Sequence, residues 1–424
     1  MAPAASRALV LGYSWRGLPL IFSLNSTGGR IGRPEACGEI SSPPGRPGGV
    51  DWQAARSLSI GYRRRITTTY DVEHRYWRQE PMNKKIAILG TGANGSVISA
   101  DLIQAGLDVT MIDMWGAHIE EMRANGLTIA SGEDETNLAV NAFHLSDVCT
   151  FTEKFDVVLL VSKAYDTRWL AEFIKPYIAE DGVMVGVQNA MTAEEIAEIV
   201  GVERTLGCVV ELASQIFEPG EVRRSTTKDH TWYGIGAFDP SQERHIDLVA
   251  EILGHSGRLE VIDDILSAKW MKLIVNSMIM GSMAILGGTP EQILKQNGAA
   301  YAQRAREWFL QAGEEALAAG QSLDYKIVPV FGLKPEDVTN TNNLLETLLD
   351  KILLDIGPGP VNTSLQDHMK GRLCETALIN GLVAEECEKN GRPAPVCEHM
   401  VELSRQIHAG ELKPDPSNLD LVRQ

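Results

Sequence analysis

The sequence lacks the features that would assign this chain to a membrane or to nucleic acid. No apolar run approaches the roughly 18–20 residues of a membrane-spanning helix. Basic residues are too few for a nucleic-acid or anionic-membrane surface, because 39 Lys and Arg stand against 56 Asp and Glu, with a net charge of −17. We therefore expect neither nucleic acid nor membrane among its partners.

Metal and disulfide signatures are missing as well. The six cysteines show no C-x-x-C spacing, and the nine histidines show no H-x-x-x-H or other ligand spacing. Scattered cysteines are typical of reduced thiols, so we predict a cytoplasmic protein without a metal site. No Tyr has a Lys four positions later, which argues against a short-chain dehydrogenase.

Lysine is absent from the first 81 residues. This segment holds 11 Arg and 6 acids, so its charge is 11 − 6 = +5 and the rest of the chain carries −17 − 5 = −22. Its Gly, Pro and Arg clusters show neither the alternation of apolar residues that is typical of a strand nor the 3.6-residue repeat of a helix. We therefore predict that this segment is a weakly ordered extension with no part in the chemistry. Upstream sequence from a misplaced start, with Met82 as the true beginning, is the favoured interpretation. A transit segment comes second and a disordered tail is the third alternative.

From Lys85 onward, apolar strands alternate with helical patterns. This alternation predicts an α/β fold with a mostly parallel, doubly wound sheet over residues 82–263. The predicted strands are 85–89, 107–113, 155–162, 182–187, 205–210, 231–237 and 258–262, with helices that include 96–106 and 192–200.

After about Asp264 the strand patterns stop. Helices are predicted at 265–286, 291–319, 343–354, 363–390 and 395–409, separated by Gly and Pro. The sequence therefore predicts an all-helical C-terminal domain over residues 264–424.

A G-x-G-x-x-G pattern lies between the first strand and the first helix. Gly90 permits the turn, Gly92 lets the backbone approach a pyrophosphate, and Gly95 lets helix and strand pack closely. This context predicts a Rossmann domain whose helix start holds a dinucleotide. The predicted cofactor-binding loop is Gly90, Thr91, Gly92, Ala93, Asn94 and Gly95.

Asp113 ends the second strand, 18 residues after Gly95. An acid there accepts hydrogen bonds from the adenosine ribose and repels a 2′-phosphate, so it favours NAD(H) over NADP(H). A solvated strand-end Asp is the alternative. Lys163 and Gln188-Asn189 follow two later strands, whose carboxyl ends face the ligand crevice in open α/β folds. From position alone, ordinary loop polarity explains them equally well.

The stretch AKWMKLIVNSMIM is apolar almost all round, yet it carries Lys272 and Asn276 on one helix face. A buried ammonium needs a partner, so the two either form a structural pair or line a cleft. Glu375 falls on an apolar stripe with Leu378, Ile379 and Leu382. A buried Lys and a buried Glu beside a nicotinamide would make an acid–base set.

Together these motifs resemble the ketopantoate reductase (2-dehydropantoate 2-reductase) family over residues 82 to about 410. The matching stretches are KIAILGTGANGS, LLVSKAYD, GVQNAM, AKWMKLIVNS and TSLQDHMKGRLCETALING. The resemblance implies a Rossmann domain followed by a helical domain, with a 2-oxo acid bound between them. It also makes NADP(H) the usual cofactor and a homodimer plausible.

The resemblance also implies roles for individual residues. Lys272 would be the general acid that protonates the carbonyl oxygen, and Glu375 would hold that lysine and the substrate. Asn189, Asn276 and Thr363 would orient the substrate, and Asn189 would also reach the cofactor. Lys163 would lie near the nicotinamide.

Several departures from the family pattern leave the substrate open. Asp113 stands where a basic or neutral residue is usual, Ala190 replaces a glycine, and Met280 replaces an asparagine that would contact substrate. The segment 325–360 is longer than the usual connection. Reduction of ketopantoate to pantoate, a step of pantothenate biosynthesis, is the leading hypothesis. A dehydrogenase of another 2-oxo or 2-hydroxy acid and a non-catalytic dinucleotide sensor are the alternatives.

Overall fold

The computed structural model describes residues 12–13, 19–20, 83–338 and 343–422. The chain forms two compact units, Met1–Ile66 and Thr67–Gln424. In the first unit, strands β1 (Gly12–Tyr13) and β2 (Pro19–Leu20) pair antiparallel. The other residues of the segment 1–81 lie outside the described residues, so the three interpretations of that segment stay predictions. The domain boundaries also stay a prediction.

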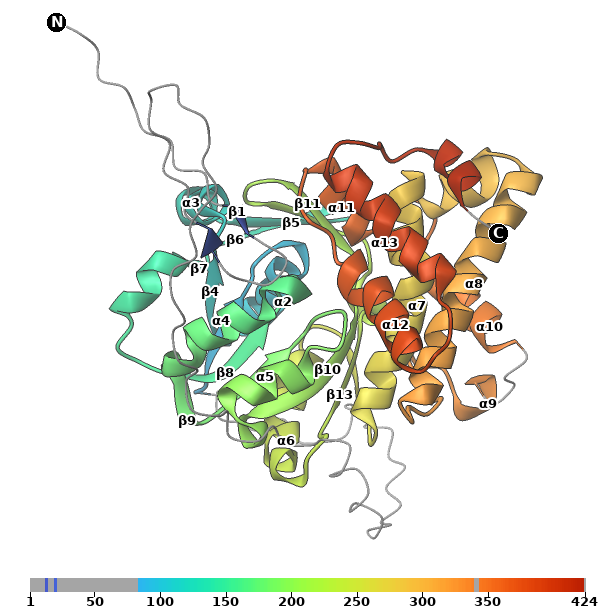
Figure 1. The fold of residues 1–424 in the computed structure, drawn as a ribbon. Helices are drawn as coiled ribbons and strands as arrows, with labels where there is room; N and C mark the ends of the chain where they lie inside the picture. Colours follow the sequence, from blue (N-terminus) through green and yellow to red (C-terminus); the bar gives the residue numbers. More distant parts are fainter. Residues whose placement is uncertain (1–11, 14–18, 21–82, 339–342, 423–424) are drawn as a thin grey trace, which may run out of the picture. The chain divides into compact units, whose positions relative to one another are not determined.

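The second unit begins with an eight-stranded sheet of order β14-β13-β10-β9-β8-β3-β4-β7 (Figure 1). Every neighbouring pair is parallel except β10 and β13. This confirms the predicted fold class. The strands are β3 (Lys85–Leu89), β4 (Asp108–Asp113), β7 (Asn141–His144), β8 (Phe155–Leu160), β9 (Ile178–Gly186), β10 (Thr205–Glu211), β13 (Trp232–Gly236) and β14 (Arg258–Val261).

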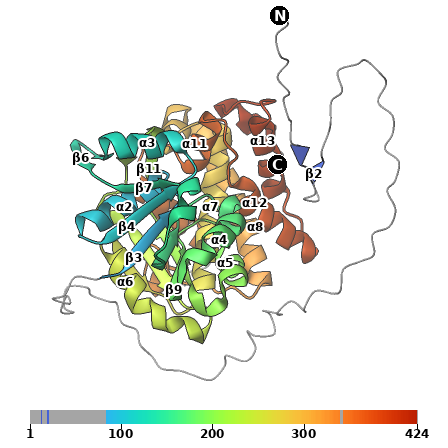
Figure 2. The ribbon, with the colours of Figure 1, turned by 90° about the vertical axis from the view of Figure 1, so that its left-hand side faces the viewer.

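Helices cover both faces of this sheet. Along β3, Ile86 and Ile88 pack into one core, whereas Ala87 and Leu89 pack into another, because alternate residues of a strand face opposite sides. The first core includes α2 (Ala93–Gln104), α3 (Gly116–Asn125) and α6 (Ile246–Gly254). The second includes α4 (Thr167–Ile174) and α5 (Ala193–Val200), so α4 and α5 lie opposite α2 and α6 (Figure 2).

A second, four-stranded sheet was not predicted. Its order is β11-β12-β5-β6, and the pairing of β12 with β5 joins segments almost a hundred residues apart. The strand β6 is polar and largely exposed, so it has no alternation of apolar and polar residues to detect. The strands are β5 (Leu127–Ser131), β6 (Asp134–Leu138), β11 (Ser214–Glu218) and β12 (Glu221–Arg224).

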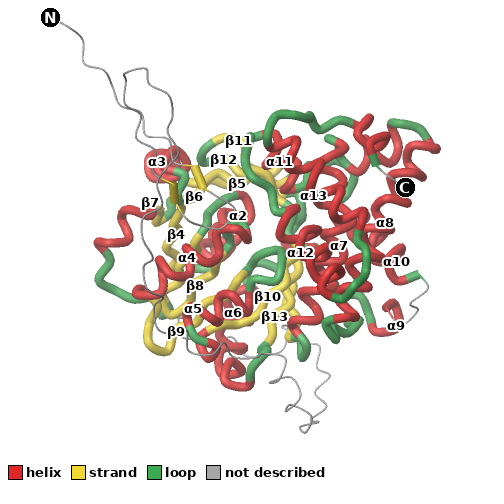
Figure 3. The backbone as a smooth tube through the Cα atoms, viewed as in Figure 1, coloured by secondary structure: helices red, strands yellow, loops and turns green. Residues whose placement is uncertain are grey.

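The remainder of the unit is helical (Figure 3). The buried helix α7 (Ile265–Leu286) has the predicted bounds, with Asp264 accepting a hydrogen bond from the Ser267 N–H at its start. Around it lie α8 (Ala299–Ser322), α9 (Pro335–Val338), α10 (Leu344–Ile356), α11 (Thr363–Met369), α12 (Thr376–Lys389) and α13 (Pro395–His408). None of the described helices has the length and apolar character to cross a membrane.

Two predicted helices are each divided in the structure. The predicted helix 363–390 is α11 and α12, because Gly371 adopts a left-handed φ of 64° in the connection between them. The predicted helix 291–319 is a short π-helical turn (Gln292–Gln296) followed by α8, with Gly298 at φ 88° between. Apolar periodicity continues through both breaks, so it could not locate them.

Candidate active site

A cavity of about 550 Å³ lies where the carboxyl ends of the sheet strands meet the helical part. Loops after β3, β4, β8 and β9 line one side, and α7, α10 and α11 line the other. The structure brings together most of the predicted site residues in this cavity. They are Gly90, Gly92, Ala93, Asn94, Asp113, Lys163, Asn189, Lys272, Asn276, Thr363 and Glu375.

The glycine loop is built as the motif predicts. A Cβ on Gly90 would lie 2.5 Å from the backbone nitrogen of Ser162, and one on Gly95 would lie 2.1 Å from the Gly90 carbonyl oxygen. A Cβ on Gly92 would meet nothing within 4 Å, because this residue faces the cavity. Gly92 also caps α2 without any side-chain hydrogen bond, so the first N–H groups of the helix are free to hold phosphates. These residues therefore fit a dinucleotide.

Thr91 and Gly95 do not line the cavity, and their cofactor-binding role stays a prediction. A buried histidine from α3, His118, supports the glycine loop. Its role was not predicted from the sequence. Its Nδ1 accepts a hydrogen bond from the Gly220 N–H at 2.8 Å, so its Nε2 carries the proton and donates to the Thr91 carbonyl at 2.9 Å. Burial lowers the pKa of His118, which favours this neutral form.

Asp113 lies at the cavity, at the end of β4. Its Oδ1 accepts a hydrogen bond from the Trp115 N–H at 2.8 Å, and its Oδ2 lies 3.5 Å from the Thr91 hydroxyl. The structure adds a cation that the sequence reasoning did not predict. Arg372, from the connection between α11 and α12, lies over the Trp115 ring at 5.1 Å, and it lines the cavity together with Lys370.

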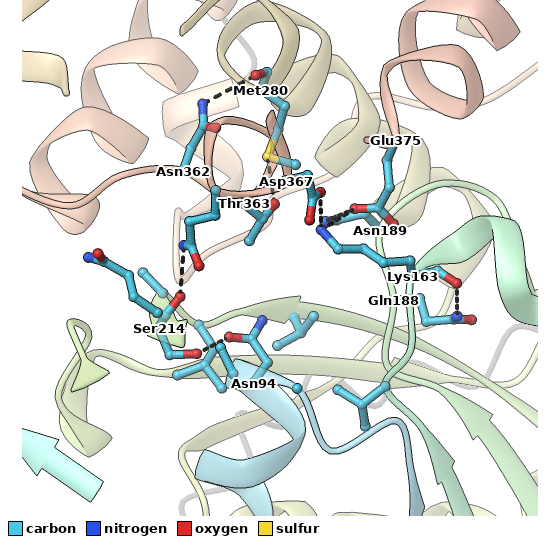
Figure 4. A pocket seen from close by; sticks show the side chains of 18 of the residues that line it. Asn94, Lys163, Gln188, Asn189, Ser214, Met280, Asn362, Thr363, Asp367 and Glu375 are labelled. Carbon is cyan, nitrogen blue, oxygen red and sulfur yellow. Dashed lines mark hydrogen bonds and ion pairs between the residues drawn. The ribbon is translucent and has the colours of Figure 1, made fainter. Parts of the chain in front are cut away.

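A network of polar side chains joins the sheet to the helical part (Figure 4). Lys163 donates to Asp367 on α11 at 2.5 Å, and its Nζ lies 3.9 Å from Glu375. Burial alone would lower the pKa of Lys163, but the carboxylates of Glu375 and Asp367 outweigh it and raise that pKa. Asp367 lies in the matching stretch TSLQDHMKGRLCETALING, but no role was predicted for it.

Glu375 connects this ion pair to two asparagines. It accepts hydrogen bonds from the Ala164 N–H at 2.9 Å and from Asn189 at 3.4 Å, and Asn276 donates to Asn189 at 2.9 Å. Glu375 is buried, as expected, but it precedes α12 as its N-cap residue. The prediction that Leu378 belongs to a buried apolar stripe was wrong, because this side chain is exposed.

Lys272 and Asn276 both face the cavity, which answers the question raised by their spacing on α7. Within the described residues, no hydrogen bond or ion pair joins Lys272 to Glu375. The carboxylates that act on Lys272 are those of Glu211 and Asp355, and they partly offset the lowering of its pKa by burial. Its ammonium also lies 4.8 Å from the centre of the Phe331 ring.

Thr363 and Met280 lie together at the helical side of the cavity. The Thr363 hydroxyl is 3.6 Å from the Met280 sulfur. Asn362 caps α11 through the Leu365 N–H and donates to the carbonyls of Ile279 and Met280. The methionine thus occupies an apolar position beside a hydroxyl, where the resemblance led us to expect a second amide.

Residues 86–237 match the family model described as ketopantoate reductase PanE/ApbA, and residues 264–408 match its C-terminal model. A 2-dehydropantoate 2-reductase from Pyrococcus horikoshii is 30% identical over 319 residues, which are 74% of this chain and 93% of that protein.

Two solved structures show the same fold. D-mandelate dehydrogenase with NADH and anilino(oxo)acetate is 21% identical with a TM-score of 0.67, and covers 77% of this chain and 99% of its own. A dimeric ketopantoate reductase from Staphylococcus aureus is 18% identical with a TM-score of 0.58 and the same coverage. With its glycine loop, Lys272 and Asn276 around one cavity, this chain belongs to the ketopantoate reductase PanE/ApbA family and is an NAD(P)-dependent oxidoreductase.

Proposed function

We propose that this protein reduces a 2-oxo acid to the 2-hydroxy acid with NAD(P)H, and that ketopantoate is its substrate. The observation that carries the proposal is the position of Lys272 and Asn276, which face the cavity also lined by the glycine loop. The name of the Pyrococcus horikoshii relative supports the choice of ketopantoate.

Lys272 is the proposed general acid. When bound, the reduced nicotinamide supplies a hydride to the carbonyl carbon, so negative charge develops on the carbonyl oxygen. Because burial lowers the pKa of Lys272, its ammonium gives up a proton more readily than an exposed lysine does. A general acid of this kind contributes roughly 10²–10⁴ to the rate.

The remaining site residues position the substrate and cofactor. Asn189 and Asn276 hold each other through one hydrogen bond, and Glu375 fixes Asn189 from the other side. The amide groups are therefore oriented before substrate arrives. Thr363 offers a hydroxyl from the helical side, and Lys163 places a cation beside Glu375.

For the cofactor, we propose NAD(H), because the Asp113 carboxylate would repel a 2′-phosphate. NADP(H) is the alternative, supported by Lys370 and Arg372 at the same cavity. A homodimer and a cytoplasmic location stay predictions, the first supported by the dimeric Staphylococcus aureus protein.

A different 2-oxo or 2-hydroxy acid is the second candidate. Met280 favours it, because a thioether at the cavity contacts an apolar group better than a polar one. The D-mandelate dehydrogenase of the same fold is named for such an acid. A dinucleotide sensor without turnover is the third candidate. The grouping of Lys272, Asn276 and Asn189 argues against it.

The test is a spectrophotometric assay of the full chain with NADH and NADPH in separate runs. Ketopantoate would be compared with a panel of 2-oxo acids, and the matching 2-hydroxy acids would test the reverse direction. We expect turnover of ketopantoate that falls roughly 10²–10⁴-fold in Lys272→Ala. The control is Lys334→Ala, an exposed lysine outside the cavity.

The outcomes of this assay distinguish the three candidate functions and test the role of Lys272. Turnover of another acid alone would keep the chemistry and remove ketopantoate as the substrate. Dinucleotide binding without turnover of any acid would support the sensor. Equal turnover by Lys272→Ala and the control would refute Lys272 as the general acid.

A further inference from the structure

Glu211 is a buried carboxyl group whose hydrogen bonds are incompletely satisfied. It ends β10 at the cavity and is only 5% exposed. Among the described residues its oxygens meet the Asp355 carboxyl group through a side-chain hydrogen bond, but no N–H or hydroxyl group donates to them. Because leaving a buried acid unpaired is costly, such a group in a cavity indicates a ligand that completes its hydrogen bonds.

Three charged side chains surround Glu211. They are Lys272 from α7 and, from α10, Asp355 with its ion-pair partner Lys351. Burial raises the pKa of Glu211 to about 8, so this carboxyl group is neutral below that pH. A neutral carboxyl group has no charge for an ion to offset, so the partner it lacks is a neutral hydrogen-bonding group.

The walls around this cluster are apolar. Ile279 and Met280 line the cavity from α7, and Ile352 and Ile356 line it from α10. The helix α10 belongs to the segment 325–360, which the sequence analysis found longer than usual for the family. This segment therefore supplies one side of the apolar wall, and also Asp355, which acts on Glu211.

We propose that Glu211 determines specificity by accepting a hydrogen bond from a hydroxyl group on an aliphatic 2-oxo acid. This inference rests on the proposed function, in which Lys272 protonates the carbonyl oxygen. Glu211 and Lys272 line the same cavity, so one small substrate can reach both of them. Asp355 acts behind Glu211 as a positioning residue. The hydroxymethyl group of ketopantoate fits this description.

The test compares two substrates that differ only in the hydroxymethyl group. The ratio of kcat/KM for ketopantoate to that for 2-oxo-3-methylbutanoate, which lacks the hydroxymethyl group, measures recognition of the hydroxyl. We expect the wild-type ratio to exceed one by roughly 10–100-fold, and Glu211→Leu to lower it to near one. Glu211→Gln should keep part of it, because an amide oxygen still accepts the hydrogen bond.

The control variant is Asp350→Asn, which removes an exposed acid from α10 outside the cavity and should leave the ratio unchanged. If Glu211→Leu fails to fold, as judged by thermal unfolding, the wild-type ratio and Glu211→Gln decide. A wild-type ratio near one overturns the proposal, as does an unchanged ratio in Glu211→Gln and Glu211→Leu. A preference for an amino over a hydroxyl group at the same carbon overturns the neutral subsite.

Failure of the proposed function gives a different result. If ketopantoate is not turned over but other hydroxylated 2-oxo acids are, and Glu211→Leu removes that preference, the subsite stands and ketopantoate is wrong. If ketopantoate is turned over with a ratio independent of Glu211, the function stands and the subsite is wrong. No turnover of any 2-oxo acid overturns both.

Discussion

At the scale of single residues, Gly90 and Gly92 belong to one motif but meet opposite constraints. Gly90 has a φ of 95° and no room for a Cβ, whereas Gly92 has an ordinary φ of −63° and open space at the cavity. Gly90→Ala should lower the free energy of unfolding by about 2 kcal/mol or more, through strain and overpacking. Gly92→Ala should fold normally but bind dinucleotide at least roughly tenfold more weakly, because its methyl group occupies space that the pyrophosphate needs.

Chemical denaturation and fluorescence titration with NADH and NADPH would check both substitutions. Gly254→Ala, in a helix with open space at that position and outside the cavity, is the control. The prediction fails if Gly90→Ala is as stable as this control, or if Gly92→Ala binds as tightly as the wild type.

Asp113 determines the cofactor preference if the proposed NAD(H) specificity is correct. Asp113→Ser should raise the ratio of kcat/KM with NADPH to that with NADH by roughly tenfold, because the carboxylate no longer repels a 2′-phosphate. Lys370 and Arg372 then act as nearby cations. Steady-state kinetics with both cofactors measures the ratio, and Asp108→Ser, at the exposed start of the same strand, is the control. An unchanged ratio would remove Asp113 as the determinant.

At the scale of elements, Lys163 and Asp367 tie the loop after β8 to α11. Asp367 is 3% exposed, so this pair is buried on one side. Lys163→Met should destabilise the protein by about 3 kcal/mol, because Asp367 and Glu375 are left as buried carboxylates without their cation. The double variant Lys163→Met/Asp367→Leu should cost less than the sum of the single variants, with a coupling of roughly 0.5–3 kcal/mol.

Urea unfolding of the four proteins in this cycle measures the coupling. The more exposed pair of half-buried Arg306 and exposed Asp350 gives the matched cycle, where we expect less than about 1 kcal/mol. Additive effects at Lys163 and Asp367 would show that the ion pair does not stabilise the contact between the two elements.

Elements were predicted well where the pattern is local. The bounds of β3 and α7 were predicted to the residue, because both are continuous apolar segments with clear starts. The sheet β11-β12-β5-β6 was missed because its strands are stabilised by pairing between distant segments. The break between α11 and α12 was missed because only the left-handed conformation of Gly371 reveals it.

At the scale of the whole molecule, burial of Glu211 makes stability depend on pH. Burial raises the pKa of Glu211 from 4.5 to about 8, and Asp355 adds to this effect while Lys272 and Lys351 oppose it. The folded protein therefore holds a proton that the unfolded chain has lost between about pH 5 and pH 8. Stability falls as pH rises through this window, by at most about 1.4 kcal/mol per pH unit for one proton.

Thermal unfolding of the wild type and Glu211→Gln between pH 5.5 and 7.5 would check this dependence. The amide cannot titrate, so the stability of the variant relative to the wild type should increase with pH. A pH-independent difference would show that Glu211 is ionised throughout.

The sequence by itself determined the doubly wound sheet, the glycine loop, the buried helix with Lys272 and Asn276, and the family. These features depend on residues close together in the chain, where strand and helix periods and motif spacing are visible. Only the tertiary structure decided the partners: Asp367 and Glu375 for Lys163, and Glu211 and Asp355 for Lys272. Such pairs join side chains as many as 212 positions apart (375 − 163). Their electrostatic interactions depend on burial and on distances in space, neither of which the order of residues contains.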